Sequence, residues 1–321
     1  MKKITALLLA LLMLAGVLAG CGKQNDTNKT DKLSIVTTIF PEYDWVKEVL
    51  GDKADSAEIT MLLDNGVDLH SYQPTADDLI KLSDCDLFVY VGGESDEWVE
   101  DALKSAANRD RKVINLLETL GDSVKEEETV EGMQEEEEDH EEKEYDEHVW
   151  LSLKNAKTLV GAISESLQEL DPGNKDTYAA NADAYVQKLS ALDAEYQKAV
   201  SAGTYKTLLF GDRFPFRYLV DDYGLSYYAA FAGCSAESEA SFETVSFLAG
   251  KVDEGKLPCV LTIEGKNHKI AETIVQNTAG KNQKILTMDS MQSTTSQDVA
   301  NGTTYLSLMA KNLDVLKEAL G

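Results

Sequence analysis

Histidine is scarce in this chain, so any site built on imidazole has few candidates. The 321 residues contain four: His70, His140, His148 and His268. His70 lies in GVDLHSYQPT, shortly after an apolar run, and His148 lies where an acidic segment gives way to a helical pattern. Neutral imidazole binds Zn²⁺ and other transition metals. Because both histidines lie at the edges of ordered elements, a metal site is one hypothesis, beside the ordinary structural role of a single histidine.

Short apolar runs alternate with helical stretches along the chain, which predicts parallel strands with crossover helices. Four runs precede the middle of the chain and four follow it, so we expect an α/β protein with two similar lobes. Ligands of such sheets collect at the carboxyl ends of strands, where His70 would lie. The predicted strands fall within residues 32–40, 56–63, 86–93, 112–118, 207–212, 227–233, 259–265 and 284–289.

A single long helix is predicted between the lobes. Residues 174–202 contain neither glycine nor proline, and Asp171, Pro172 and Gly173 break the chain before them. About 28 helical residues span roughly 40 Å, enough to run along both lobes. We therefore expect an N-terminal lobe at 32–172, a linking helix at 173–203 and a C-terminal lobe at 204–321. The apolar face comprises Tyr178, Tyr185, Leu189, Leu192, Tyr196 and Val200.

The charge is strongly negative and unevenly distributed. The chain has 30 Lys and Arg residues and 57 Asp and Glu residues, which gives a formal net charge of −27 at pH 7. This charge argues against binding to nucleic acid. Residues 125–147 hold fourteen acidic residues and two lysines, a net −12, around His140. This composition predicts a disordered, solvated loop. Its carboxylates could also collect divalent cations weakly.

The first residues predict export and lipid attachment. A basic start and an apolar run lead to Leu18-Ala19-Gly20-Cys21, which resembles the lipobox of bacterial lipoproteins. We expect residues 1–20 to be a signal peptide and 21–31 a flexible tether. Lipid on Cys21 would hold the protein on the extracytoplasmic face of the cell membrane.

The other cysteines do not form a disulfide framework. Cys85, Cys234 and Cys259 are far apart and include no CxxC pair, although one pair could still form. Cys85 and Cys259 lie in apolar strand-like runs, so we expect buried thiols there.

The amino-acid sequence of several segments resembles that of the metal-binding lipoproteins that serve zinc and manganese ABC importers. The resemblance covers nearly all of the mature chain, including IVTTIFPEYDWVKEVLG, HVWLSLKNAKTL and FRYLVDDYGL. It implies two (β/α)4 lobes joined by one long rigid helix, with the metal ion held in the interlobe cleft. In that family two histidines of the N-terminal lobe, a third histidine or glutamate, and an acidic residue of the second lobe bind the ion.

By this resemblance His70 matches the first ligand, His148 the second, and Asp289 the acidic fourth. The third does not carry over, since the family position, five residues before Tyr218, is Arg213 here. Guanidinium cannot bind a cation.

His268, the only histidine of the second lobe, is our predicted third ligand, and Asp212 and Glu264 are the alternatives. Three imidazoles and a carboxylate favour Zn²⁺, whereas Asp212 or Glu264 in place of His268 would move the preference toward Mn²⁺.

The resemblance implies capture of Zn²⁺, or alternatively Mn²⁺, and delivery to an ABC permease and its ATPase by a monomeric, non-enzymatic protein. An envelope zinc hydrolase is a competing hypothesis, weakened because the chain has no HExxH, GxSxG or P-loop motif. An adhesin remains a third possibility on residues alone.

Overall fold

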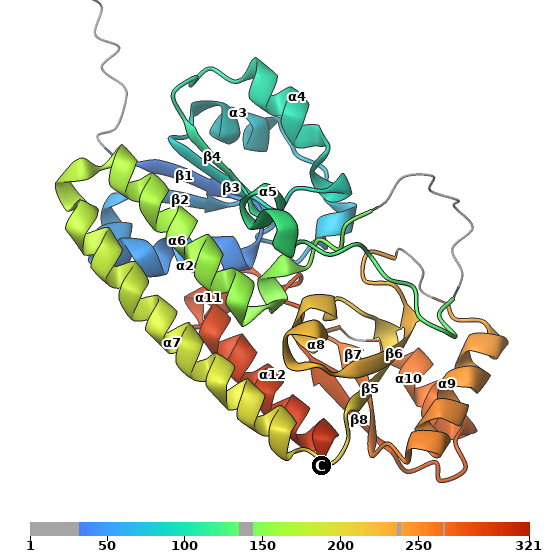
Figure 1. Cartoon of the computed structure of the whole chain (residues 1–321). Helices are drawn as coiled ribbons and strands as arrows, with labels where there is room; N and C mark the ends of the chain where they lie inside the picture. Colours follow the sequence, from blue (N-terminus) through green and yellow to red (C-terminus); the bar gives the residue numbers. More distant parts are fainter. Residues whose placement is uncertain (1–31, 135–143, 236–238, 266) are drawn as a thin grey trace, which may run out of the picture. The chain divides into compact units, whose positions relative to one another are not determined.

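The computed structural model describes residues 32–134, 144–235, 239–265 and 267–321. The compact unit Leu33–Gly321 contains two four-stranded parallel sheets, with strand orders β2-β1-β3-β4 and β6-β5-β7-β8 (Figure 1). The predicted α/β fold and all eight predicted strand positions are thus confirmed. The strands are β1 (Ser34–Thr37), β2 (Glu58–Met61), β3 (Leu87–Tyr90), β4 (Lys112–Asn115), β5 (Thr207–Arg213), β6 (Ser226–Phe231), β7 (Cys259–Ile263) and β8 (Lys284–Met288).

Helices connect the strands in each lobe, as parallel pairing requires. Those of the first lobe are α2 (Phe40–Leu50), α3 (Ala76–Asp84), α4 (Trp98–Ser105), α5 (Leu116–Leu120) and α6 (Leu153–Leu170). Those of the second are α8 (Arg217–Tyr223), α9 (Phe242–Gly255), α10 (Lys269–Asn277), α11 (Ser296–Ala300) and α12 (Tyr305–Leu320). In the described part of the chain no helix combines the length and the apolar character needed to cross a bilayer.

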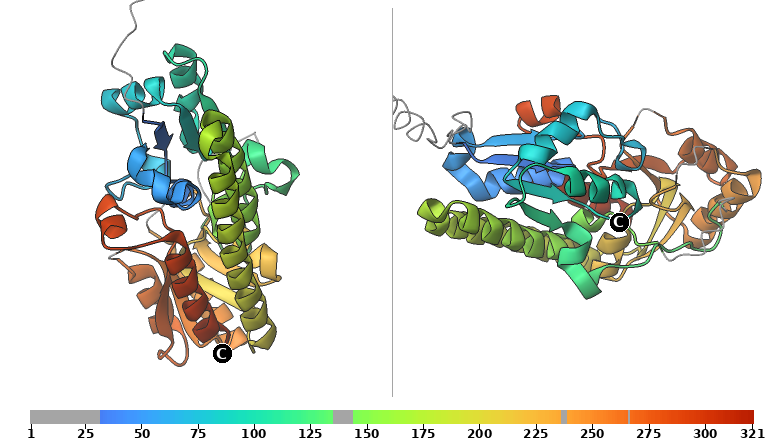
Figure 2. Two further views of the ribbon diagram at one scale, coloured as in Figure 1. Left: turned by 90° about the vertical axis from the view of Figure 1, so that its left-hand side faces the viewer. Right: turned by 90° about the horizontal axis from the view of Figure 1, so that it is seen from above.

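The predicted linking helix is α7 (Lys175–Ala202), an uninterrupted helix of 28 residues. It packs on α2 and α6 of the first lobe and on α12 of the second, and its passage beside α12 is visible in Figure 2. Five of the six predicted apolar positions are buried, and Leu192 is partly buried. The helix therefore forms part of a core that both lobes share.

The lobes are also joined by a buried polar and aromatic contact. The Trp45 ring packs edge-on against Tyr305 at 5.1 Å between centroids. The Tyr305 hydroxyl donates to the Trp150 carbonyl at 2.6 Å, and the Trp150 indole N–H donates to the Ser290 carbonyl at 2.8 Å. Because these two hydrogen bonds satisfy the buried Tyr305 hydroxyl and Trp150 indole N–H across the lobes, this contact stabilises one interlobe arrangement.

Cys85 and Cys259 are buried free thiols, as predicted, among the described residues.

Candidate metal centre

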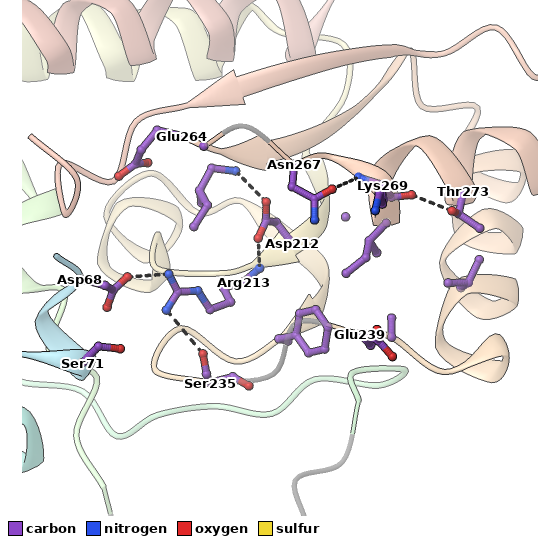
Figure 3. Close-up of a pocket in the computed structure, with 17 residues that line it drawn as sticks. Asp68, Ser71, Asp212, Arg213, Ser235, Glu239, Glu264, Asn267, Lys269 and Thr273 are labelled. Atoms are coloured by element: carbon purple, nitrogen blue, oxygen red, sulfur yellow. Dashed lines mark hydrogen bonds and ion pairs between the residues drawn. The ribbon is translucent and has the colours of Figure 1, made fainter. Parts of the chain in front are cut away.

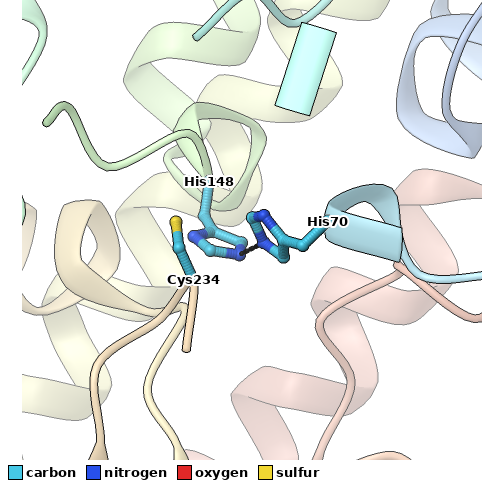
Figure 4. A group of neighbouring side chains, drawn as sticks. All are labelled: His70, His148 and Cys234. Atoms are coloured by element: carbon cyan, nitrogen blue, oxygen red, sulfur yellow. Dashed lines mark hydrogen bonds between the residues drawn. The ribbon is translucent and has the colours of Figure 1, made fainter. Parts of the chain in front are cut away.

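The side chains of His70 and His148, 78 residues apart, meet at the carboxyl edge of the first sheet. Their Nε2 atoms are 3.2 Å apart (Figure 4). His70 lies in a 3-10 turn, Leu69–Ser71, where Asp68 caps the His70 N–H at 3.1 Å. His148 directly precedes a second such turn, Val149–Leu151. The two turns thus orient both imidazoles toward one point.

The His148 ring is fully buried and is held by Asp146. Asp146 Oδ1 lies 2.8 Å from the His148 backbone N–H and 3.0 Å from Nδ1. An imidazole that donates Nδ1–H to a carboxylate presents Nε2 to a metal, and such contacts both orient the ring and increase its basicity.

His70 has corresponding partners at its own Nδ1. The Ser95 hydroxyl lies at 2.8 Å and Glu147 Oε2 at 3.5 Å. Glu147 is buried, and its Oε1 accepts the Ser95 N–H at 2.9 Å. Its Oε2 has no hydrogen-bond partner among the described residues. Burial raises the pKa of Glu147 to about 7, so the metal-free pocket carries less negative charge than its composition suggests.

The pKa values of the two imidazoles are shifted in opposite directions. Burial lowers the pKa of His70 far below its usual value, and the charge of His148 adds to that effect. Burial also acts to lower the pKa of His148, but the Asp146 carboxylate outweighs it and raises the pKa. The two shifts favour a protonated His148 beside a neutral His70. A divalent cation between the Nε2 atoms would compete with any proton held there.

Cys234, which is not among the ligands predicted from the sequence, completes the group. The ligand atoms of His70, His148 and Cys234 lie within 4.8 Å of one another. Burial and the charges of Glu127, Asp146 and Glu147 raise the thiol pKa of Cys234 well above its usual value. A usable signal was present in the sequence, because Cys234 directly follows the predicted strand 227–233, the same kind of edge that singled out His70.

The other two predicted ligands are not brought to the imidazole pair. No group of three such ligand atoms within 4.8 Å includes His268 or Asp289 in the part of the chain that the structure describes. His268 is the N-cap of α10, and Asp289, directly after β8, accepts the Met291 N–H at 2.8 Å. Burial, with the charge of Glu264, raises the pKa of Asp289 to about 6.

The two alternative carboxylates are engaged by backbone groups. Asp212 accepts the N–H groups of Arg213 at 2.9 Å and Ile263 at 3.3 Å. Glu264 accepts the N–H and the hydroxyl of Ser290, both at 2.6 Å. These carboxylates therefore cap the strand ends of the second lobe.

A cavity of about 750 Å³ opens beside these strand ends (Figure 3). Asp68 and Ser71 of the first lobe line it together with Asp212, Arg213 and Glu264 of the second. The cavity therefore lies between the lobes, next to the turn that carries His70.

Both described flanks of the acidic segment are ordered, contrary to the expectation of a solvated loop over 125–147. Met133 and Asp146 are buried, and the Gln134 N–H donates to the Ala230 carbonyl at 2.9 Å. The Tyr218 hydroxyl accepts the Lys125 N–H and donates to the Asp146 carbonyl. Composition alone misses these contacts because they use backbone groups and few side chains. His140 lies outside the described residues.

Comparison with known proteins shows the family of the chain. The family model of the zinc-uptake complex component A, periplasmic (ZnuA), matches residues 35–319. The chain is 34% identical over 324 residues to the zinc-binding lipoprotein AdcA of Streptococcus pneumoniae, covering 99% of this chain and 61% of that protein. It is 31% identical over 317 residues to the high-affinity zinc uptake system protein ZnuA of Bacillus subtilis. This match covers 95% of this chain and 94% of that protein.

Among solved structures, the Zn(II)-bound ZnuA-like domain of Streptococcus pneumoniae AdcA superposes with a TM-score of 0.70 at 32% identity. The match covers 90% of this chain and 99% of that one. The chain spans about three fifths of the length of the AdcA relative. With a family match over nearly all of the described fold, this chain belongs to the ZnuA family of zinc-uptake binding proteins.

Proposed function

We propose that this protein captures Zn²⁺ outside the cytoplasm and delivers it to an ABC permease powered by an ATPase. The observation that carries the proposal is the meeting of His70 and His148, with Nε2 atoms 3.2 Å apart and each Nδ1 held by a neighbouring side chain. Two nitrogens about 3.3 Å apart fit one tetrahedral zinc ion with Zn–N bonds of about 2.0–2.1 Å. The protein binds and releases the ion without chemical conversion.

The names of the relatives support zinc as the cargo and a lipoprotein as its carrier. Attachment through Cys21 and a monomeric state are parts of the proposal that derive from the sequence. So are the domain limits 1–20, 21–31, 32–172, 173–203 and 204–321.

Asp289 is kept in the proposal as an acidic donor. Because its carboxylate lies outside the group around His70 and His148, it would have to approach the ion when the lobes close. His268 has no such support from the geometry. It lies in the second lobe at the start of α10, near Asp212, whose pKa burial raises.

The test is zinc titration of the full chain and three alanine variants. His70→Ala and His148→Ala should each lose at least about a hundredfold in affinity, more than loss of a supporting contact costs. His268→Ala should retain the affinity if the geometry holds, and lose it if the sequence-based prediction is right. Wild-type protein that does not retain zinc, or a gene deletion that leaves growth at low zinc unchanged, would refute the proposed function.

A further inference from the structure

The second lobe must supply a donor if the ion is to be held between the lobes. The position where the family carries a third ligand is Arg213, which is already engaged. Its guanidinium donates to Asp68 Oδ2 at 2.6 Å and to the Ser235 carbonyl at 3.4 Å. Arg213 therefore links the first lobe to the loop that contains Cys234.

That loop lies directly against the His148 ring. A Cβ placed on Gly233 would come within 3.1 Å of His148 Cε1 and 3.0 Å of the Phe214 carbonyl oxygen. A side chain at this position would require its neighbours to shift by a few tenths of an ångström, so glycine favours the close approach. The Cys234 N–H donates to Glu127 Oε1 at 3.0 Å, which ties the loop to the described flank of the acidic segment.

The sulfur is consequently positioned beside the imidazoles. Cys234 follows β6 at the carboxyl edge of the second sheet, so it reaches the pair from the opposite lobe, as Figure 4 shows. A tetrahedral ion with Zn–S of about 2.3 Å and Zn–N of about 2.0–2.1 Å requires nitrogen–sulfur separations of about 3.5 Å. Because the ligand atoms already lie within 4.8 Å of one another, reaching that distance requires a shift of at most about 1.3 Å.

We propose that Cys234 is the second-lobe ligand of the transported ion, so that His70, His148 and a Cys234 thiolate replace the donor set expected from the family. The inference rests on the proposed function and deepens it. The thiol proton leaves to solvent as the Zn–S bond forms, and the fourth position is left to a carboxylate or water oxygen. Since thiolate is a soft donor that Mn²⁺ disfavours, Cys234 also selects zinc over manganese.

Cobalt binding provides a spectroscopic test, first on the wild-type chain and then on variants. Co²⁺ added to the full chain, kept reduced, should produce the near-ultraviolet sulfur-to-cobalt charge-transfer band, and Zn²⁺ should abolish it. The band should disappear in Cys234→Ser and Cys234→Ala. It should persist in the matched controls Cys21→Ser, Cys85→Ser and Cys259→Ser.

Zinc competition then measures the energetic contribution of the sulfur. Cys234→Ser should lower zinc affinity by about a hundredfold or more, while manganese affinity changes by less than about threefold. Circular dichroism of each variant checks folding. In wild-type protein, zinc should also protect Cys234 from iodoacetamide, as read by mass spectrometry of the labelled peptide.

The inference fails if wild-type protein binds zinc tightly but shows no charge-transfer band and no protection of Cys234. In that case the proposed function still stands with another third ligand. Wild-type protein that binds no zinc would instead overturn the proposed function itself.

Discussion

Arg213 and Asp68 form an ion pair across the two lobes, with 2.6 Å between Nη2 and Oδ2. Asp68 also accepts the His70 N–H through its other oxygen. Burial acts to raise the pKa of Asp68, but the Arg213 guanidinium outweighs it and lowers the pKa. One carboxylate thus neutralises the Arg213 cation, whose charge acts on both His70 and His148, and holds the turn of a proposed ligand.

This pair predicts a compensating double variant. Asp68→Asn leaves the Arg213 charge uncompensated beside the site and should lower zinc affinity about three- to tenfold. Adding Arg213→Gln should recover most of the loss, giving a coupling of about 1 kcal/mol. Isothermal titration of the four proteins measures the cycle, and strictly additive losses would contradict the relationship.

Asp146→Asn should weaken zinc binding without removing a ligand. An amide accepts the His148 N–H groups less strongly than a carboxylate and increases ring basicity less, so we expect an affinity loss of about 10- to 100-fold. Asp183→Asn, on the exposed face of α7, is the matched control and should bind like wild type. Equal affinities in both variants would show that Asp146 does not support the site.

Zinc affinity should fall as the pH falls. The raised pKa of His148 means that its imidazole retains a proton to higher pH than usual, and zinc must displace it. Below that pKa one displaced proton lowers apparent affinity about tenfold per pH unit. Titrations at about pH 7.5 and 5.5, in buffers of different ionisation enthalpy, measure affinity and proton release together. Equal affinities at the two pH values would argue against an imidazole site.

Asp44→Asn should stabilise the metal-free protein at neutral pH. Burial raises the pKa of Asp44 to about 6, although the carboxylate accepts the Tyr305 N–H at 3.0 Å. Since the folded pKa is above the unfolded value of 3.8, stability is lost as pH rises from about 4 to 6. The asparagine keeps the acceptor without the charge, so the variant should gain about 1–3 kcal/mol at pH 7.5 and little below pH 4. Urea unfolding with a chelator present tests this, and a gain that does not vary with pH would contradict it.

The acidic run should affect the rate of zinc capture more than the final affinity. Replacing residues 135–143 with nine glycines and serines removes attraction for cations but spares Asp146, so association should slow severalfold at low salt. The equilibrium constant should change by less than about threefold. Stopped-flow zinc exchange measures the rates. A collapse of affinity would show that the run supplies a ligand.

The strands and the linking helix could be predicted because burial leaves local periodic patterns. Apolar runs of strand length mark all eight strands, and the spacing of Tyr178, Tyr185 and Tyr196 marks the buried face of α7. His70 and His148 could be selected because histidine is rare and both lie at the edges of predicted elements. The ordered flanks of the acidic segment could not be predicted from the sequence. Contacts such as the hydrogen bond from the Gln134 N–H to the Ala230 carbonyl use backbone groups, which do not affect composition.

The sequence by itself therefore determined the two-lobed α/β architecture, the family resemblance and the imidazole pair. Only the tertiary structure decided which second-lobe side chain lies beside that pair, placing Cys234 there and His268 elsewhere. The physical reason is that a metal centre requires ligand atoms a few ångströms apart, and such distances depend on how loops from separate sheets pack. Gly233 illustrates the difference. The sequence shows that a glycine is present, but only the structure shows that its loop lies against the His148 ring.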